Sequence, residues 1–231
     1  RLSGTSMACP NLAGVVILLR QYVVENFPEI ANDNVKVNEM VNKLMMSTAD
    51  IALNTNGLPY SVRKQGAGLA NSAYAIDTYF NAAFISNPIQ ELGDDKNKTG
   101  IYTMNLTLVN DGYEDVTYND FNAYILRDQV GGSPTGYVNL RYSDHLYDGK
   151  SGSATVTYKV SGKEITSLTL KPTERKTVTV TITLAKDARE YYDTYFPNGA
   201  YVEGFVSFSN NATASVETHA TFLAYYGDWL K

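Results

Sequence analysis

The chain has 231 residues, of which 44% are hydrophobic and 12% aromatic, and its formal net charge is -5 at pH 7. This length suits one large domain or two small ones, and the scattered basic residues form no stripe of the kind that binds nucleic acid. No apolar run of membrane-spanning length is expected, and the single Cys9 excludes an internal disulfide framework and a cysteine-based metal site.

The first informative segment is the octapeptide at residues 3–10, SGTSMACP, which an apolar stretch at residues 12–19 follows. This order predicts a helix that begins at the octapeptide, because Pro10 is tolerated in a first helical turn. Ser6 would then lie where backbone N–H groups have no intrahelical partner and point toward negative charge. Acyl transfer requires a hydroxyl nucleophile beside such donors, whereas the simpler alternative is that Ser6 only caps the helix.

Residues 1–83 are expected to form helices joined by turns. The first helix is apolar on both faces, which is typical of a helix buried inside a larger body. A second helix carries apolar residues at helical spacing, namely Val37, Met40, Val41, Leu44 and Met45. A third is expected to begin near Asn71 and to run through Ala73, Ile76 and Phe80. Between the second and third, the paired glycines of residues 61–69, SVRKQGAGL, indicate a tight turn or a close backbone approach.

This helical region is too short to cover its own apolar surface. The first helix needs a sheet or further helices around it, and residues 1–83 contain few strand-like runs that could supply them. We therefore expect its packing partners to lie upstream and the chain to be a piece of a longer protein.

From about residue 84 the hydrophobic period changes to two. Tyr102, Met104, Leu106 and Leu108 alternate with polar residues up to a turn at residues 110–112, NDG, and residues 177–184 alternate in the same way. Further strands are expected around residues 116–126, 154–160, 164–170, 201–208 and 216–226. Several short, half-buried strands joined by polar turns predict an antiparallel sandwich.

Two parts of the chain resemble known families. The octapeptide around Ser6 resembles the serine motif of the subtilisin-like proteases, Gly-Thr-Ser-Met-Ala-x-Pro, and residues 44–49 and 65–69 are similar to later segments of that catalytic domain. The second part is similar to the fibronectin-type-III-like domain of the cell-envelope proteinase branch, which includes lactocepin and complement-cleaving surface peptidases of Gram-positive bacteria. The residues that carry this second resemblance are 92–94, 116–119, 196–206 and 222–229.

These resemblances imply a fold in two parts. Residues 1–83 would be the C-terminal portion of an α/β subtilisin-like catalytic domain, mostly helical in this stretch and carrying the nucleophile. Residues 84–231 would be an all-β, fibronectin-type-III-like antiparallel sandwich.

The resemblance also implies a function, a secreted or cell-wall-associated serine endopeptidase acting on protein or peptide substrates. Ser6 would be the nucleophile and its backbone N–H an oxyanion donor, with Gly4, Thr5 and Met7 supporting the site. The partner Asp, His and oxyanion Asn of the family precede the serine, so they would lie in the missing N-terminal part of the catalytic domain. The chain alone is therefore expected to be inactive. The chemistry would need no cofactor; structural calcium in the longer protein stays open and is placed on no residue here.

The two histidines of the chain are not expected to replace the missing base. His145 is expected in a polar loop and His219 on a strand, and they lack a clustered third ligand for a metal ion. Cys9 is expected to be a small buried helix residue rather than a nucleophile.

Two alternative functions remain open. The sandwich could be a binding or spacer module of a surface protein, because its many tyrosines suit recognition surfaces. The serine motif could also belong to a pseudoprotease that keeps it for folding alone.

Overall fold

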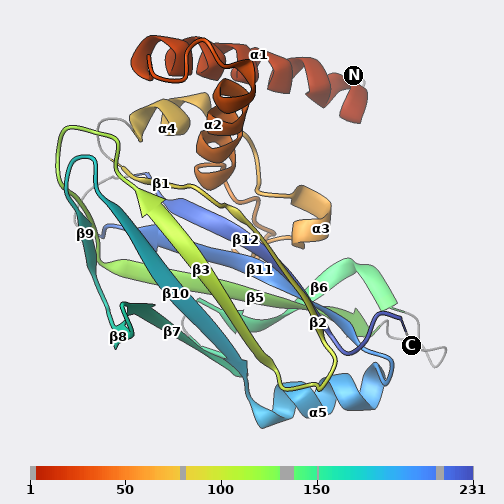
Figure 1. The fold of residues 1–231 in the computed structure, drawn as a ribbon. Helices are drawn as coiled ribbons and strands as arrows, with labels where there is room; N and C mark the ends of the chain where they lie inside the picture. The colour runs from red at the N-terminus through yellow and green to blue at the C-terminus, as the bar shows by residue number, and fades with distance from the viewer. Residues whose placement is uncertain (1–3, 79–81, 131–137, 150, 212–215, 231) are drawn as a thin grey trace.

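The computed structural model describes residues 4–78, 82–130, 138–149, 151–211 and 216–230. Figure 1 shows a group of helices lying on two facing β-sheets, where they contact the strands at residues 84–85, 200–209 and 218–226. The helices come first in the chain and the strands begin at residue 84, where the hydrophobic period was expected to change. A mostly β fold preceded by helices is therefore confirmed.

The helical segment contains α1 (Thr5–Asn26), α2 (Asn34–Ser47), α3 (Val62–Gln65) and α4 (Ser72–Asp77). Asp33 caps α2 by accepting hydrogen bonds from the Val35 and Lys36 N–H groups at 3.0 and 3.2 Å. Asn71 caps α4 as expected, by accepting a bond from the Tyr74 N–H at 3.2 Å. The expected continuation of this helix to Phe80 lies outside the described residues.

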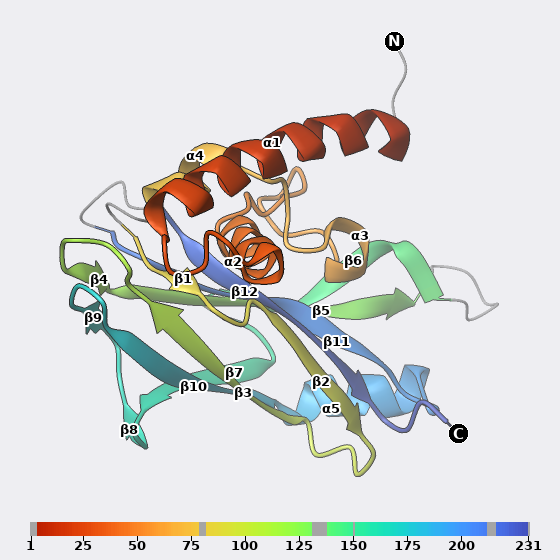
Figure 2. The same ribbon diagram turned by 45° about the horizontal axis from the view of Figure 1, so that its top comes forward.

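These helices share a small hydrophobic core, to which Phe84 and Val109 of the strand region also belong. Figure 2 shows α1 crossing over α2 and α4. The helices contribute Leu19, Tyr22 and Val23 of α1, Val37, Val41 and Leu44 of α2, and Ala75 of α4. All three α1 residues come from its C-terminal half, so the half that carries Ser6 is not anchored in this core.

In the described residues, the sandwich consists of two five-stranded sheets and a short two-stranded one. The first sheet has the order β1 (Phe84–Ile85), β3 (Ile101–Val109), β10 (Arg175–Leu184), β7 (Ala154–Val160), β8 (Lys163–Glu164). The second has the order β2 (Ile89–Asp95), β12 (Thr218–Tyr226), β11 (Ala200–Ser209), β5 (Asp120–Val130), β6 (Val138–Asp148). The short sheet pairs β4 (Val116–Tyr118) with β9 (Leu168–Leu170).

The alternation expected at residues 102–108 and 177–184 is confirmed by the register of β3 and β10. Met104 pairs with Val180 and Leu106 with Val178, and all four side chains are buried between the sheets. The intervening threonines point outward and pair across the strands, as the Thr107 and Thr177 hydroxyl oxygens do at 2.9 Å. Period-two patterning therefore directs one face of this sheet into the core.

Several details of the sandwich differ from expectation. One strand pair, β12 with β2, is parallel, so the sandwich is not wholly antiparallel. The segments expected as single strands at 116–126 and 164–170 are each broken in two, giving β4 and β5, and β8 and β9. A helix that was not expected, α5 (Lys186–Tyr195), closes one end of the sandwich. Its Tyr192 ring stacks on Tyr226 with centroids 4.9 Å apart.

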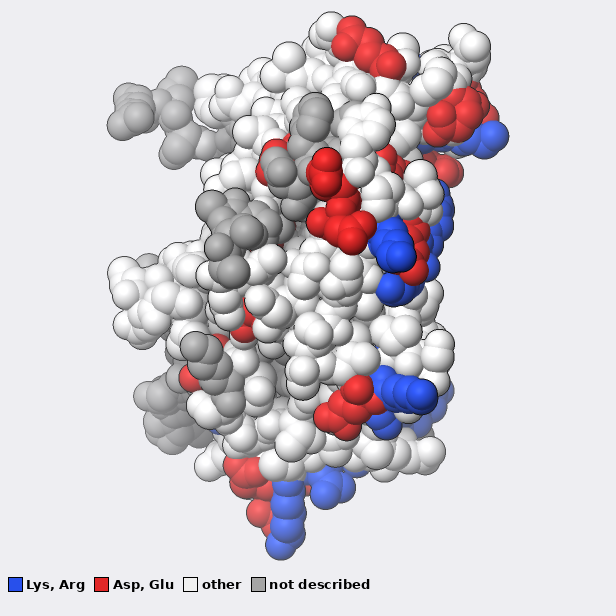
Figure 3. Space-filling model, turned by 90° about the vertical axis from the view of Figure 1, so that its left-hand side faces the viewer, with Lys and Arg blue, Asp and Glu red and all other residues white. Residues whose placement is uncertain are grey.

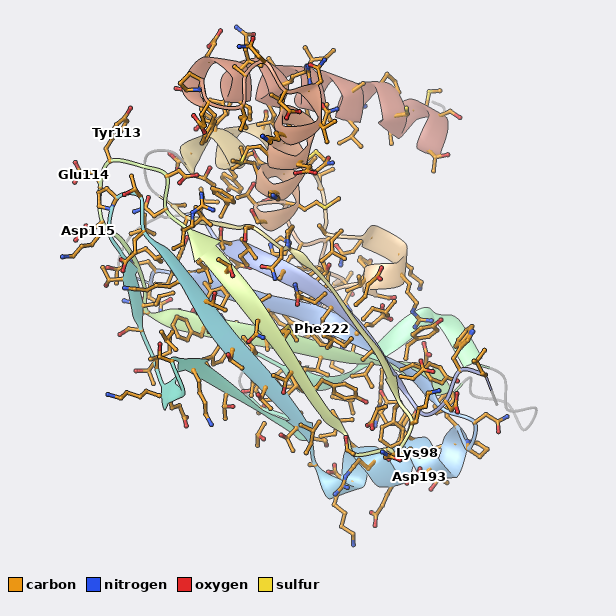
Figure 4. The ribbon with its side chains drawn as sticks, viewed as in Figure 1. Lys98, Tyr113, Glu114, Asp115, Asp193 and Phe222 are labelled. Atoms are coloured by element: carbon orange, nitrogen blue, oxygen red, sulfur yellow. The ribbon has the colours of Figure 1, made fainter. Side chains whose placement is uncertain are left out.

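An ion pair ties α5 to the loop between β2 and β3. The Lys98 ammonium lies 2.8 Å from the Asp193 carboxylate, and Figure 4 shows the two side chains meeting below the sandwich while Phe222 points into its interior.

The loop of Tyr113, Glu114 and Asp115 lies at the opposite end of the sandwich from this ion pair. On the face shown in Figure 3, basic side chains lie beside acidic ones.

Helix α1 has the length and apolar composition of a helix that could cross a membrane, which was not expected from the sequence. The core helices of soluble proteins have the same properties, so this observation alone does not indicate a membrane. It does show how much apolar surface the helix carries.

Candidate active site

Ser6 is the second residue of α1 and is exposed at the N-terminal end of the helix. Gly4, directly before the helix, has φ 148° and ψ 175°, a backbone conformation that residues with a side chain rarely adopt. Its carbonyl oxygen accepts hydrogen bonds from the Met7 and Ala8 N–H groups at 3.0 and 3.1 Å. The Ser6 N–H precedes these first bonds of the helix and faces outward.

This arrangement places a hydroxyl and a backbone N–H together at the positive end of a 22-residue helix. Such a group can hold an oxyanion next to an attacking oxygen, which is what the expected role requires. Thr5 begins the helix, and Met7 is the next residue after Ser6 and is also exposed. The catalytic role of Ser6 and the supporting roles of Gly4, Thr5 and Met7 stay predictions.

Helix α1 exposes large apolar side chains along most of its length. The exposed fractions are 44% for Leu12, 67% for Ile17, 54% for Leu18 and 38% for Val24. Cys9 is exposed as well, so the expectation that it is buried is wrong for this chain. The cause is that α1 is exposed up to residue 14 and packs against other described residues from Val15 onward.

His219 lies on β12, as expected, and is 1% exposed. Its Nε2 atom is 2.9 Å from the Ala67 carbonyl oxygen, and its ring packs edge-on against Phe205 with centroids 5.9 Å apart. Burial lowers the pKa of His219 to about 4, against smaller raising effects from the Ala67 carbonyl and Asp50. This histidine is therefore neutral and held within the interface between the helices and the sandwich.

His145 lies on β6 rather than in the polar loop that was expected, and it pairs with Leu126 of β5. The surrounding acidic and aromatic residues suggested a loop, but they belong to a strand at the edge of the second sheet. Among the residues that the structure describes, no hydrogen bond joins Ser6 to either histidine or to a carboxylate.

The glycine-rich segment at residues 61–69 makes a close backbone approach, as predicted. Gly68 has φ 125°, and a Cβ atom there would lie 2.3 Å from the Asp50 carbonyl oxygen. Leu69 and Asp50 exchange two backbone hydrogen bonds of 2.8 Å at this point. Only glycine permits this contact, which closes residues 50–69 into a compact loop.

The charged residues that join this segment to the sandwich were not expected from the sequence. Arg63 of α3 forms ion pairs with Glu203 of β11 and Asp128 of β5. A signal was present in the sequence, because Glu203 is the charged residue of a mostly apolar strand; in the structure it is fully buried. In the described part of the chain, no group of three or more His, Cys, Asp or Glu side chains could hold a metal ion.

The sandwich identifies the class of protein. Residues 90–218 match the Fn3-like domain model, which covers more than half of the chain, and the chain belongs to this family. The match begins in β2 and ends at the first residue of β12.

Comparison with curated proteins extends the resemblance to the helical segment. The chain is 26% identical to the C5a peptidase of Streptococcus pyogenes over 99% of its own length and 18% of that protein. It is 27% identical to the PI-type proteinase of Lactococcus lactis subsp. cremoris and 28% identical to the PII-type proteinase of Lacticaseibacillus paracasei. These alignments cover 99% of the chain and 11% of each proteinase. The resemblance to cell-envelope proteinases is confirmed, and the chain spans less than one fifth of the relatives' length.

Proposed function

We propose that the chain is part of a subtilisin-like serine endopeptidase, secreted or associated with the cell wall, in which Ser6 is the nucleophile. Residues 1–83 would complete a catalytic domain whose other part lies upstream. The observation that carries this proposal is the serine motif at an exposed helix N-terminus, in a chain similar to named proteinases over almost its whole length.

The surface of α1 supports the existence of an upstream partner. Ile17 and Leu18 are more than half exposed, which is unfavourable for large apolar side chains in water. Gly14 lies in the interior of the helix, and a Cβ atom built there meets nothing within 4 Å. Because glycine weakens a helix interior, its use is explained if another segment approaches the helix closely at this residue.

In the proposed mechanism the Ser6 hydroxyl attacks the carbonyl carbon of a peptide bond and forms an acyl-enzyme that water then hydrolyses. An upstream histidine, oriented by an aspartate, takes the proton from the serine and donates it to the leaving amine. The Ser6 N–H and an upstream asparagine side chain stabilise the oxyanion. No cofactor takes part in these steps.

The 231-residue chain alone would be inactive under this proposal. Removing the histidine of such a triad reduces kcat about 10⁶-fold, and here the aspartate and asparagine would be absent as well. The Ser6 hydroxyl would then have no general base to activate it.

A fluorophosphonate probe tests the proposal on the full-length protein. We expect covalent labelling at Ser6, loss of labelling in Ser6→Ala, and unchanged labelling in Ser151→Ala, which alters an exposed serine of the sandwich. The 231-residue chain should not react. A correctly folded full-length protein that does not react would contradict the proposal and favour a pseudoprotease or a binding module.

A further inference from the structure

The carboxylate of Glu203 is fully buried, yet it accepts four hydrogen bonds from the segment around α3. The Ser61 hydroxyl donates to Oε1 at 2.8 Å, and the Arg63 backbone N–H donates to Oε2 at 3.0 Å. The Arg63 guanidinium adds bonds to Oε1 from Nε at 3.0 Å and from Nη2 at 2.8 Å. Glu203 thus joins the Fn3-like sandwich to the helical segment at one point.

Two neighbours of Arg63 complete this arrangement. Asp128 of the adjacent strand β5 also accepts a bond from Nη2, and the guanidinium lies over the Tyr201 ring, 4.3 Å from its centroid. Burial acts to lower the pKa of Arg63, but the hydrogen bonds that its guanidinium donates to Glu203 and Asp128 outweigh this effect and raise the pKa. Because a buried carboxylate is costly without its partners, residues 61–63 are confined to one position on the sheet.

Further hydrogen bonds connect residues 61–65 to α4. The Gln65 side chain bonds the backbone of Ala52 in both directions, at 2.7 and 3.1 Å. The Asp50 carboxylate accepts a bond of 3.0 Å from the side chain of Asn71, the residue that caps α4. Residues 50–71 therefore form one hydrogen-bonded unit between β11 and α4.

Helix α4 in turn contacts the C-terminal half of α1. Ala75 of α4 is buried in the same cluster as Leu19 and Val23 of α1. Ser6 lies 13 residues before Leu19, a distance of about 20 Å at 1.5 Å per residue. A tilt of about 3° at the anchored half therefore moves Ser6 by about 1 Å, and a misplacement of this size can reduce an enzymatic rate about 10²-fold.

We propose that Glu203 is a positioning residue, through which the Fn3-like sandwich sets the orientation of α1 and hence of Ser6. The inference rests on the proposed function, because it assigns the sandwich a role in the reaction of that serine. It makes the sandwich more than a spacer, although no residue of it touches the reacting atoms.

The test is made on the full-length protein with Glu203→Gln, which keeps the size of the side chain but replaces one acceptor oxygen with a donor facing Arg63. The matched control is Glu190→Gln, which alters an exposed pair with Lys186 on α5. We expect Glu203→Gln to lower kcat and the rate of Ser6 labelling at least 10-fold, with KM changed less than threefold. Hydrogen exchange at residues 61–77 should become faster, and the control should match the unmodified protein in every measurement.

Ser61→Ala removes only one of the four bonds and serves if Glu203→Gln does not fold. It should lower the labelling rate in the same direction by about threefold. A folded variant with faster hydrogen exchange or a lower Tm, but with Ser6 labelled at the normal rate, would overturn the positioning role, because a merely structural contact gives that result.

Failure of the proposed function gives a different pattern. In that case the unmodified full-length protein is not labelled at Ser6 at all. Hydrogen exchange then tests the mechanical link directly: faster exchange in residues 15–24 of α1 supports it, and unchanged exchange there overturns it.

Discussion

The Nε2 atom of His219 lies 2.9 Å from the carbonyl oxygen of Ala67, so a histidine of the Fn3-like sandwich is bonded to the backbone of the helical segment. A carbonyl oxygen can only accept, so Nε2 carries the proton in this bond. The ring is buried, and its pKa of about 4 means that the folded state holds it neutral.

The stability of the chain should therefore depend on the protonation of His219. The unfolded chain binds a proton near pH 6.5, whereas the folded chain binds it only near pH 4, so the folded state is weakened as pH falls between these values. Above pH 6.5 the histidine is neutral in both states and stability is not reduced. At pH 4 its protonation in the unfolded chain lowers the free energy of unfolding by about 3 kcal/mol. Urea unfolding at a series of pH values measures the change.

His219→Gln is the variant for comparison, because glutamine keeps an N–H donor and does not titrate. Its free energy of unfolding should fall less steeply than that of the unmodified chain between pH 6.5 and 4. Equal slopes for the two proteins in this range would show that His219 does not carry the pH dependence.

A second prediction compares two buried tyrosine hydroxyls. The Tyr118 hydroxyl accepts a bond from the Ala83 N–H at 2.8 Å and lies 3.2 Å from the Ala83 carbonyl oxygen, at the junction of the two parts of the chain. The Tyr102 hydroxyl is buried and has no hydrogen-bond partner among the described residues. Tyr118→Phe should lower the free energy of unfolding by about 1–3 kcal/mol, because the Ala83 N–H loses its partner.

Tyr102→Phe is its matched control, and it removes a hydroxyl that forms no compensating bond. This change should be neutral or slightly stabilising. Chemical denaturation of both variants measures the difference, and equal effects of the two substitutions would contradict this account of the junction.

The third prediction concerns the exposed face of α1. A 231-residue chain with Ile17 and Leu18 in water should self-associate and bind a hydrophobic dye. Ile17→Gln combined with Leu18→Gln should reduce both effects in light scattering and dye fluorescence. Tyr113→Gln, at an exposed loop of the sandwich, should change neither. If the unmodified chain is a soluble monomer that binds no dye, the exposed face of α1 does not require another segment to pack against it.

The sandwich was largely predictable because its signal is local. Alternation along residues 101–109 and 175–184 fixes both the strands and their inner faces, and turn residues mark the ends. Helix α5 was not predicted, since its three tyrosines and short length favour a strand by composition, although Ala188 and Tyr192 share one helical face. The parallel pairing of β12 with β2 joins segments more than 120 residues apart, which no local pattern encodes.

The candidate site was likewise predictable only where its signal is local. Ser6 and the helix behind it were predictable from consecutive residues, as was the close approach at Gly68. The contact of Arg63 with Glu203 spans 140 residues, so its two partners could be noticed separately but not joined without the fold. Cys9 was expected to be buried because the sequence predicts an apolar helix. It does not show how much of that helix other residues of this chain cover, and Cys9 is exposed.

The final prediction uses two glycines that differ in their surroundings. A Cβ atom at Gly204 of β11 would lie 1.8 Å from the Tyr124 carbonyl oxygen, so Gly204→Ala should destabilise the sandwich by about 3 kcal/mol. A Cβ atom at Gly14 meets nothing within 4 Å, so Gly14→Ala should stabilise α1 in the 231-residue chain by up to about 1 kcal/mol. In the full-length protein, where an upstream segment would pack against α1, Gly14→Ala should instead lower Tm and slow Ser6 labelling. Stabilisation in both proteins would mean that nothing approaches α1 closely at this residue.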